Sequence, residues 1–304
     1  MNAFSAASGA ALPGVPEISN ISGISKFVAE AAAHAPSIYN SSPWWFSTVG
    51  NAICVRADSE RTVPIADPTG RELTISCGAA ALTARVALRY LGLISEVTVL
   101  PDPGIANLLV RLRWGDERKD PGNYERRLFD EIAARANHRG GFPTDRLPPG
   151  LMSTLKEAAA RENATLRVMV DDDHRAAMLA VAAAAECAFG LDSARVAEEA
   201  KWTAHAPGQP VDRGWGARAQ VETTAPASPG VVAVLTTPGD EPADWVHAGQ
   251  ALQRVLLVAG SQRAGVAMDA TPLQFGQLRD FIGSELVGGE SPQMVLRFGM
   301  TGHA

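Results

Sequence analysis

Hydrophobic residues recur at helical spacing along several parts of the chain. Apolar positions three and four apart predict a helix at residues 24–35, which Pro36 ends, and a longer helix with one apolar face at 73–91. The second part of the chain contains further predicted helices: residues 124–135, 151–162 and 175–189, and one that ends near Gly260. The pattern therefore predicts long helices that each bury one side.

Short runs rich in β-branched and aromatic residues predict strands between these helices. They occupy residues 44–49, 52–57, 97–100, 107–114, 166–170, 231–237 and 293–298. Gly50 and Asn51 supply a hairpin turn between the first two strands, and Pro101 begins a turn between the next two. Strands and helices alternate too rarely to build the βαβ units of a doubly wound parallel sheet. We therefore predict an α+β fold.

Composition shifts divide the 304 residues into a leader, two halves and a linker. Residues 1–23 are rich in Ala, Ser, Gly and Pro, and we expect them to be a disordered leader. Residues 24–115 form one half, and residues 124–304 form the other. The polar linker at 116–123 contains Pro-Gly, which favours a boundary there.

The two halves share a weak internal echo. Segments 78–91 and 249–259 each begin with Gly, run through an Ala-Leu pair and later contain Arg-Val, which suggests a duplication. The second half also contains a long stretch at 203–230 that is loaded with Pro and Gly, with Trp215 in its middle. Unstructured loops beyond roughly 15 residues are uncommon in compact domains and often serve as lids. The segment is therefore either a lid or a disordered surface loop.

Composition and charge exclude several classes of function. The chain is 46% hydrophobic and 20% charged, as is ordinary for a globular protein, and its net charge of −6 argues against a nucleic-acid-binding face. Three cysteines without a C-x-x-C pair, and six histidines without helical ligand spacing, provide neither a disulfide framework nor a metal site. The leader lacks the Lys and Arg of a secretory signal, and the apolar window 176–185 is too short to cross a bilayer. We therefore expect a cytoplasmic protein without a membrane span.

A short segment at 35–45 is the first candidate site. It offers Ser37 and Asn40 beside Pro43 and Trp44. Such residues can hydrogen-bond the polar edge of a planar heterocycle while packing against its face. The alternative is purely structural: a helix end, a proline turn and the start of a hydrophobic strand.

Arg135, Asn137 and Arg139 form the second candidate site. Two arginines four positions apart, with an amide between them, can hold a phosphate monoester by charge-assisted hydrogen bonds. An arginine beside N1 and the C2 carbonyl of a flavin would also stabilise the anionic reduced ring. The alternative is a solvated helix end whose basic residues lie near the negative end of the helix dipole.

Both segments resemble signatures of the nitroreductase superfamily. Pro36-Ser37-x-x-Asn40-x-x-Pro43-Trp44 resembles the motif P-S-x-x-N-x-Q-P-W. Residues 135–142 resemble R-x-S-x-[RK]-x-F, with one residue inserted before Phe142. Other segments resemble the Acg-like twin-domain branch of that superfamily: residues 64–73, 76–80, 237–240, 244–252 and 292–299. The resemblance therefore covers nearly the whole chain, from about residue 24 to residue 299.

The resemblance implies a nitroreductase-like fold of two fused halves, each with a small, mostly antiparallel sheet packed by helices. Ordinary nitroreductases are homodimers with FMN at the subunit interface. The fused chain is therefore expected to act as a monomer that contains an internal pseudo-dimer, or as a homodimer of such chains. The resemblance also implies FMN as the cofactor, NAD(P)H as the reductant and a small molecule as the substrate.

Roles in flavin binding follow from the resemblance alone. Ser37 and Asn40 would contact the ring, Arg135 and Asn137 the phosphate, and Arg139 the pyrimidine edge. The backbone of Gly265 and Val266 would lie near flavin N5. The complete expected cofactor-binding set is Ser37, Asn40, Ser42, Trp44, Arg71, Arg135, Asn137, Arg139, Gly265 and Val266. No side chain is expected to act as a general acid or base, and no residue is expected to bind a metal.

Three departures from the family motifs affect the expected affinity for FMN. Ser42 replaces the motif's Gln, and Asn137 replaces a Ser or Thr, although its amide can still donate. Family members usually continue to a further Arg or Lys, whereas this sequence ends at Ala304 with only His303 near its end. Loss of one charge-assisted phosphate contact costs roughly 1.5–3 kcal/mol, so we expect weaker binding of FMN.

The predicted function is that of an FMN-dependent NAD(P)H oxidoreductase that reduces a quinone, a nitroaromatic or a similar small acceptor. One alternative is a flavin-sequestering FMN-binding protein with little or no turnover, in which segment 203–230 covers the ring and Trp215 stacks on it. A second alternative is a cofactor-free remnant that serves as a structural or interaction module.

Overall fold

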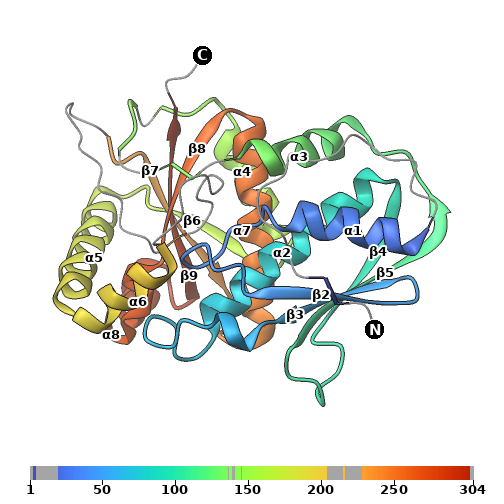
Figure 1. Ribbon diagram of the computed structural model, residues 1–304. Helices are drawn as coiled ribbons and strands as arrows, with labels where there is room; N and C mark the ends of the chain where they lie inside the picture. The colour runs from blue at the N-terminus through green and yellow to red at the C-terminus, as the bar shows by residue number, and fades with distance from the viewer. Residues whose placement is uncertain are drawn as a thin grey trace.

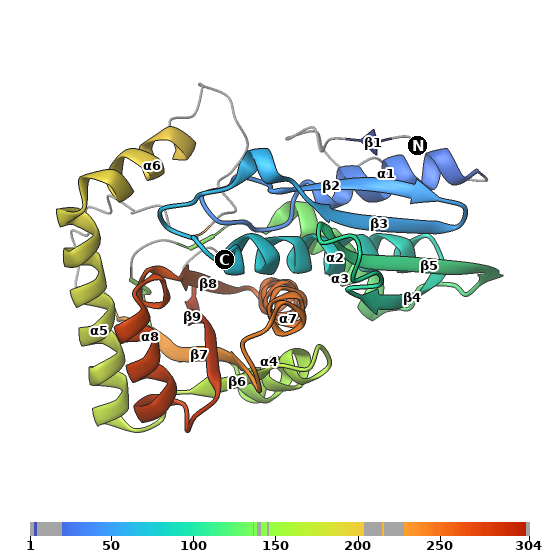
Figure 2. The same cartoon turned by 90° about the horizontal axis from the view of Figure 1, so that it is seen from below.

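Two antiparallel sheets enclose a pair of long central helices in the computed structural model (Figures 1 and 2). The structure describes residues 3–4, 20–135, 137–138, 141–144, 146–203, 215 and 228–301. The central helices are α2 (Arg71–Tyr90) and α7 (Pro242–Ser261), and Figure 2 shows them between the two sheets. The predicted α+β class is therefore confirmed.

The first sheet has five strands in the order β1-β2-β3-β5-β4, and every neighbouring pair is antiparallel. Its strands are β1 (Ala3–Phe4), β2 (Trp44–Val49), β3 (Ala52–Ala57), β4 (Leu93–Val99) and β5 (Leu108–Arg118). The hairpin between β2 and β3 has the predicted bounds because Gly50, at φ 56°, turns the chain in the left-handed region. Strand β4 begins four residues before the predicted position and pairs with β5, as expected for a hairpin.

The second sheet has four antiparallel strands in the order β6-β7-β9-β8. They are β6 (Thr165–Val168), β7 (Val231–Thr237), β8 (Ala264–Asp269) and β9 (Ser291–Met300). Strand β7 keeps the predicted bounds and is almost entirely buried. Strand β8 was not predicted as a strand, because its sequence AGVAMD contains Gly and only one β-branched residue.

Helices α2 and α7 cross where two glycines face each other. A Cβ atom on Gly78 would overlap the carbonyl oxygen of Val246, and one on Gly249 would overlap the carbonyl oxygen of Ile75. The helix backbones therefore approach more closely than any larger residue allows. Small residues around the crossing, including Ala79 and Ala248, have no exposed surface and fill the core between the sheets.

The remaining helices cover the outside of this core. Helix α1 (Ile21–Ala32) and helix α3 (Asn123–Ala134) pack on α2, and a stack of Phe27, Tyr90 and Phe129 lies between them. Helix α4 (Leu151–Ala160) packs on α7. An outer layer on the second sheet contains α5 (Asp172–Leu191), the one-turn helix η2 (Thr271–Gln274), α8 (Gly276–Phe281) and η3 (Ile282–Leu286). Helix α6 (Ser193–Thr203) follows α5 and packs on it. A further short helical turn, η1 (Ser59–Arg61), follows β3.

The structure differs from the expectations for the leader and for the apolar window 176–185. The expected leader 1–23 contains β1, which pairs with β2, and α1 begins at Ile21 because the Asn20 side chain caps it by accepting from the Gly23 N–H at 2.7 Å. Residues 5–19 lie outside the described residues.

Helix α5 extends the apolar window 176–185 to 20 residues, and among the described helices it alone has the length and composition of a membrane span. Only 17% of its apolar window is buried, and such a helix on its own is weak evidence for a span.

The glycine contact between α2 and α7 predicts a large effect of one methyl group. We expect Gly249→Ala to lower the free energy of unfolding by about 1–3 kcal/mol or more, because the new Cβ meets the backbone of Ile75, which cannot rotate away. Gly276→Ala is the matched control, since a Cβ there has no atom within 4 Å. Chemical denaturation followed by circular dichroism measures both. Equal stability of the two variants would contradict a tight crossing.

Candidate functional site

A pocket of about 660 Å³ opens where the C-terminal ends of α3 and α7 meet strand β8. We call it the β8 pocket. Its lining residues are Glu131, Ala134, Arg135, Asn137, His138, Gly141, Pro143, Leu256, Gly260, Arg263, Ala264, Gly265, Val266 and Thr301. This volume lies within the usual range for cofactor sites, which is about 300–1,000 Å³.

Phe142 holds the segment after α3 against the second sheet. Its ring is fully buried and stacks on His138 with the ring centroids 4.1 Å apart. The His138 N–H donates to the Val266 carbonyl at 3.1 Å, so the segment is tied to β8. Gly299 on β9 lies directly against the Phe142 ring, and a side chain there would overlap it. The Phe of the sequence motif is therefore an anchor that positions the residues before it.

Arg135 and Asn137 bring hydrogen-bonding groups to this pocket. The Arg135 side chain is 5% exposed, and its Nη1 donates to Asn137 Oδ1 at 2.8 Å. Arg263, which follows α7 with a left-handed φ of 59°, is a second arginine in the lining of the pocket. Burial raises the pKa of the Glu131 carboxyl above its usual range, and the positive charge of Arg135 opposes this shift. Two guanidinium groups and an amide are a donor set that fits a phosphate.

The loop that carries Ser37 has an unusual backbone. Tyr39, Asn40 and Ser42 all have left-handed φ angles, of 47°, 56° and 47°. The Ser37 hydroxyl accepts from the Ser42 N–H at 3.0 Å and has no exposed surface. A non-glycine residue at positive φ is uncommon, and such strain clusters at functional sites. The loop is therefore held in a specific shape rather than being a plain proline turn.

Trp215 covers this loop. Its N–H donates to the Ser37 carbonyl at 3.1 Å, and its carbonyl accepts from the Tyr39 N–H at 2.8 Å. The indole Nε1 donates to Oε2 of Glu72 on α2 at 2.7 Å, and the side chain is 1% exposed. Within 203–230 the structure describes Thr203, Trp215 and residues 228–230. The rest of the expected lid lies outside the described residues.

Arg71 and Glu72 form a buried ion pair next to Trp215. Arg71 Nη2 lies 3.3 Å from Glu72 Oε1, and Nη1 donates to the Gln293 carbonyl at 3.0 Å. Burial raises the pKa of Glu72 to about 7, although the charge of Arg71 and the bond from Trp215 oppose the shift. The nearby Asp67 carboxylate raises it further. Glu72 therefore changes its charge near neutral pH while it holds the indole of Trp215.

The residues expected from sequence fall into separate groups. Four line the β8 pocket: Arg135, Asn137, Gly265 and Val266. Five others do not line it: Ser37, Asn40, Ser42 and Trp44 lie on or just after the loop under Trp215, and Arg71 lies beside Glu72. Trp44 is 2% exposed as the first residue of β2. Arg139 lies outside the described residues. The structure therefore brings Arg135 and Asn137, which were expected to bind phosphate, into the same pocket as the backbone of β8.

The sequence interpretation missed two parts of this region. Arg263 follows a helix end without any motif around it, so nothing in the sequence marked it. Glu72 was not considered, because its partner Trp215 is 143 positions away in the chain. A charged residue within an otherwise apolar face of α2 was the one signal that could have identified it.

Comparison with known proteins finds relatives that carry a nitroreductase name. No protein-family model matches the chain. A protein of Mycobacterium tuberculosis named "Putative NAD(P)H nitroreductase" is 28% identical over 289 residues, which cover 88% of this chain and 82% of the relative. An uncharacterized protein of the same organism is 25% identical over 293 residues, which cover 88% of this chain and 84% of the relative. A protein named "Putative NAD(P)H nitroreductase acg", also from that organism, is 29% identical over 89 residues, or 29% of this chain and 27% of the relative.

Over most of its length, this chain is therefore similar to a protein named a putative NAD(P)H nitroreductase. The resemblance found in the sequence motifs is therefore confirmed. Among solved structures, a nitroreductase with bound FMN from Desulfitobacterium hafniense overlaps 59% of this chain and 90% of its own, with a TM-score of 0.40 and 16% identity.

The Glu72 carboxyl predicts a pH dependence of stability in this nitroreductase homologue. Its folded pKa of about 7 exceeds the ordinary value of 4.5, so between these values the folded protein binds more protons than the unfolded chain. This group therefore makes folding less favourable as the pH rises from about 4.5 to about 7.

We expect the free energy of unfolding of the wild type, measured against Glu72→Gln, to fall over this range. Chemical denaturation at several pH values measures the difference, and Glu60→Gln, at an exposed position, is the control. Only the slope is diagnostic, because the variant also removes the partner of Arg71. A difference that does not vary with pH would contradict the raised pKa.

Proposed function

We propose that this protein is an FMN-dependent NAD(P)H oxidoreductase of the nitroreductase type that reduces a quinone, a nitroaromatic or a similar small acceptor. The observation that carries this proposal is the β8 pocket. It gathers Arg135 and Asn137 from the end of α3 with Gly265 and Val266 from β8, although about 130 positions separate the two pairs. The name of the relative that is 28% identical over 88% of this chain supports the same reaction type.

The residues present fit an FMN phosphate. Arg135 and Asn137 would hold the phosphate, and Arg263 adds a positive charge to the same pocket. Arg139 would extend this group toward the polar edge of the ring. The backbone of Gly265 and Val266 would lie along the ring. Only glycine fits at position 265 without a shift of its neighbours, because a Cβ there would meet the side chains of Thr301 and Phe142.

The loop after α1 would hold the ring from the other half of the chain. Ser37, Asn40 and Ser42 supply hydroxyl and amide groups on a strained backbone, and Trp44 fixes the loop to β2. Arg71 already donates to Gln293 and Glu72, so in this structure its role is to hold Glu72 under Trp215. When bound, the flavin would take a hydride from NAD(P)H and pass it to the acceptor. The chain itself would position the reactants and exclude water.

A second candidate function is sequestration of FMN with little turnover. The buried Trp215 favours it, since its backbone and indole bonds close the surface of the Ser37 loop. In that case Trp215 would keep NAD(P)H and acceptors from the ring. We further propose that the chain acts in the cytoplasm, with its two halves forming one complete site in a monomer or in each chain of a homodimer.

Loss of Arg135 tests the assignment of the β8 pocket. We expect Arg135→Gln to weaken FMN binding by about tenfold or more, because a charge-assisted contact to phosphate is lost. Quenching of flavin fluorescence on titration with FMN measures the affinity, and bleaching of bound flavin by NAD(P)H then tests reduction. Arg175→Gln is the control, because Arg175 pairs with Asp172 on the exposed α5. If the wild type does not bind FMN, or if Arg135→Gln binds it equally well, the proposal fails.

Loss of Trp215 separates the two candidate functions. For a sequestering protein, we expect slow reduction of bound flavin by NAD(P)H in the wild type and at least tenfold faster reduction in Trp215→Ala. Trp215→Phe is the matched variant, because it keeps a covering ring and removes only the bond to Glu72. Stopped-flow absorbance of the flavin measures all three rates. Rapid reduction in the wild type, equal to that of Trp215→Ala, would contradict sequestration.

A further inference from the structure

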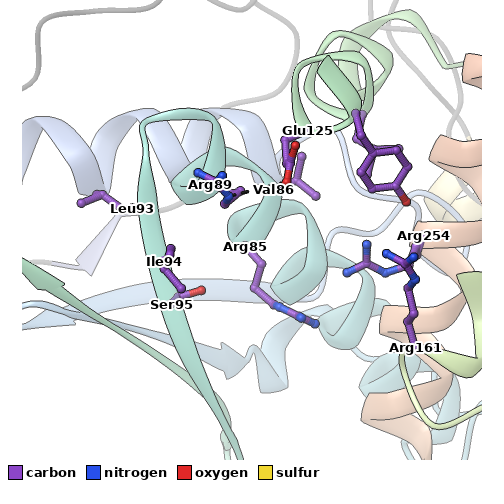
Figure 3. Close-up of a pocket in the computed structure, with 11 residues that line it drawn as sticks. Arg85, Val86, Arg89, Leu93, Ile94, Ser95, Glu125, Arg161 and Arg254 are labelled. Carbon is purple, nitrogen blue, oxygen red and sulfur yellow. Dashed lines mark ion pairs between the residues drawn. The ribbon is translucent and has the colours of Figure 1, made fainter. Parts of the chain in front are cut away.

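A second pocket, of about 280 Å³, lies at the C-terminal end of α2 (Figure 3). We call it the β4 pocket, because strand β4 forms one wall. Its lining residues are Arg85, Val86, Arg89, Leu93, Ile94, Ser95, Tyr124, Glu125, Leu128, Arg161 and Arg254. They come from α2, β4, α3, α7 and the residue that follows α4. Four of the lining residues are arginines.

The arginines have few acidic partners. Arg85 Nη1 lies 2.6 Å from Glu162 Oε2, and Arg254 Nε donates to the other oxygen of the same carboxylate at 2.7 Å. Arg89 lies 3.7 Å from Glu125 and otherwise donates to backbone carbonyls. Among the described residues, the four arginines of the lining therefore share two carboxylates as ion-pair partners, those of Glu162 and Glu125. The excess of two positive charges is costly, because like charges repel at short range.

Among these four arginines, Arg161 alone makes no ion pair with the described residues of the chain. It is exposed, and its guanidinium lies over the Tyr124 ring at 6.0 Å from the ring centroid. Figure 3 shows the side chains of Arg85, Arg161 and Arg254 directed into the same space. An anion in that space would meet three guanidinium groups from three different elements.

Residues that line this pocket and residues that line the β8 pocket are separated by one constant offset in residue number. Gly78 and Gly249, which meet at the crossing of α2 and α7, are 171 positions apart. The same shift matches five residues of the β4 pocket with five of the β8 pocket: Arg85 with Leu256, Arg89 with Gly260, Leu93 with Ala264, Ile94 with Gly265, and Ser95 with Val266. Each set begins on a central helix and ends on the strand that follows it. The two pockets are therefore counterparts in the two halves of the chain.

The matched positions differ in a way that changes what each pocket can hold. Gly260 and Gly265 are packed closely, since a Cβ there would meet the side chains of Glu131 and Thr301, whereas their counterparts Arg89 and Ile94 carry long side chains. The β4 pocket is less than half the size, about 280 Å³ against about 660 Å³. This space is small for a flavin. Leu256 in the β8 pocket corresponds to Arg85 in the β4 pocket. This position is therefore apolar in the first pocket and charged in the second.

We propose that the β4 pocket binds a small organic phosphate monoester. A phosphate group concentrates about two negative charges on one compact centre, which matches the local excess of positive charge. Guanidinium groups recognise its oxygens by paired hydrogen bonds. The organic part of the ligand would lie against Leu93, Leu128 and the ring of Tyr124. This inference stands on the β4 pocket alone and does not depend on flavin binding.

Phenyl phosphate is a suitable probe, with inorganic phosphate, succinate and benzoate as comparisons. Isothermal titration calorimetry at constant ionic strength measures binding to the full chain. Because the β8 pocket also offers a phosphate site, each titration is repeated in Arg135→Gln, which weakens that site only. We expect phenyl phosphate to bind in both backgrounds, and to bind more tightly than benzoate or succinate.

Two substitutions locate the binding. Arg161→Gln removes an exposed guanidinium and Ser95→Asp adds a negative charge to the wall, so each should weaken phenyl phosphate binding by about tenfold or more. Arg175→Gln, on α5, should leave it unchanged. Circular dichroism confirms that the variants are folded.

Absence of binding in the wild type would overturn the proposal, and so would equal binding by the wild type and both β4-pocket variants. If succinate bound more tightly than phenyl phosphate, the proposal of a phosphate monoester would be wrong and the ligand class would be a dicarboxylate. Loss of FMN binding with retained phenyl phosphate binding would overturn the proposed function and leave this inference standing.

Discussion

The close approach of α2 and α7 at Gly78 and Gly249 is the contact on which the other sites depend. It brings the two sheets together across one core, because each helix packs on its own sheet and on the other helix. The C-terminal end of α7 then forms one wall of the β8 pocket, and the C-terminal end of α2 forms one wall of the β4 pocket. The N-terminal turn of α2 places Glu72 under Trp215. One contact between backbones therefore positions three separate groups of polar side chains.

Much of the fold follows from local sequence patterns, and the exceptions have identifiable causes. Strands β2, β3 and β7 have the predicted bounds, since alternating or continuous apolar residues between turn residues specify them locally. Strand β8 depends instead on pairing with β9 along its whole length, which no local pattern reveals. Helix α6, which was not predicted, is tied to the first half by Glu198, whose carboxylate accepts from the N–H groups of Ile65 and Ala66. Such long-range bonds override weak local propensity.

The candidate site was predictable where a motif specified it and unpredictable where its partners are far apart in the chain. Arg135 and Asn137 were predicted from a segment that resembles a family motif, and both line one pocket. The pairing of Trp215 with Glu72 spans 143 positions, so it exists only in the folded chain. The arginines of the β4 pocket come from α2, α7 and the end of α4, and in sequence each is an ordinary basic residue of an amphipathic helix. Their charges indicate a candidate anion site only in the folded structure, where the helices bring them together.

The matched spacing of the two pockets along one polypeptide has a consequence for how the protein can change. In a symmetric dimer of identical subunits, a single codon specifies both copies of each wall residue, so the two cavities must remain alike. In this chain Gly260 and Arg89 are encoded separately, and one cavity can be remodelled while its counterpart is preserved. Encoding both pockets at separate positions of one chain thus removes a genetic constraint that symmetry would impose, and it permits the lining of one pocket to change while the other is kept.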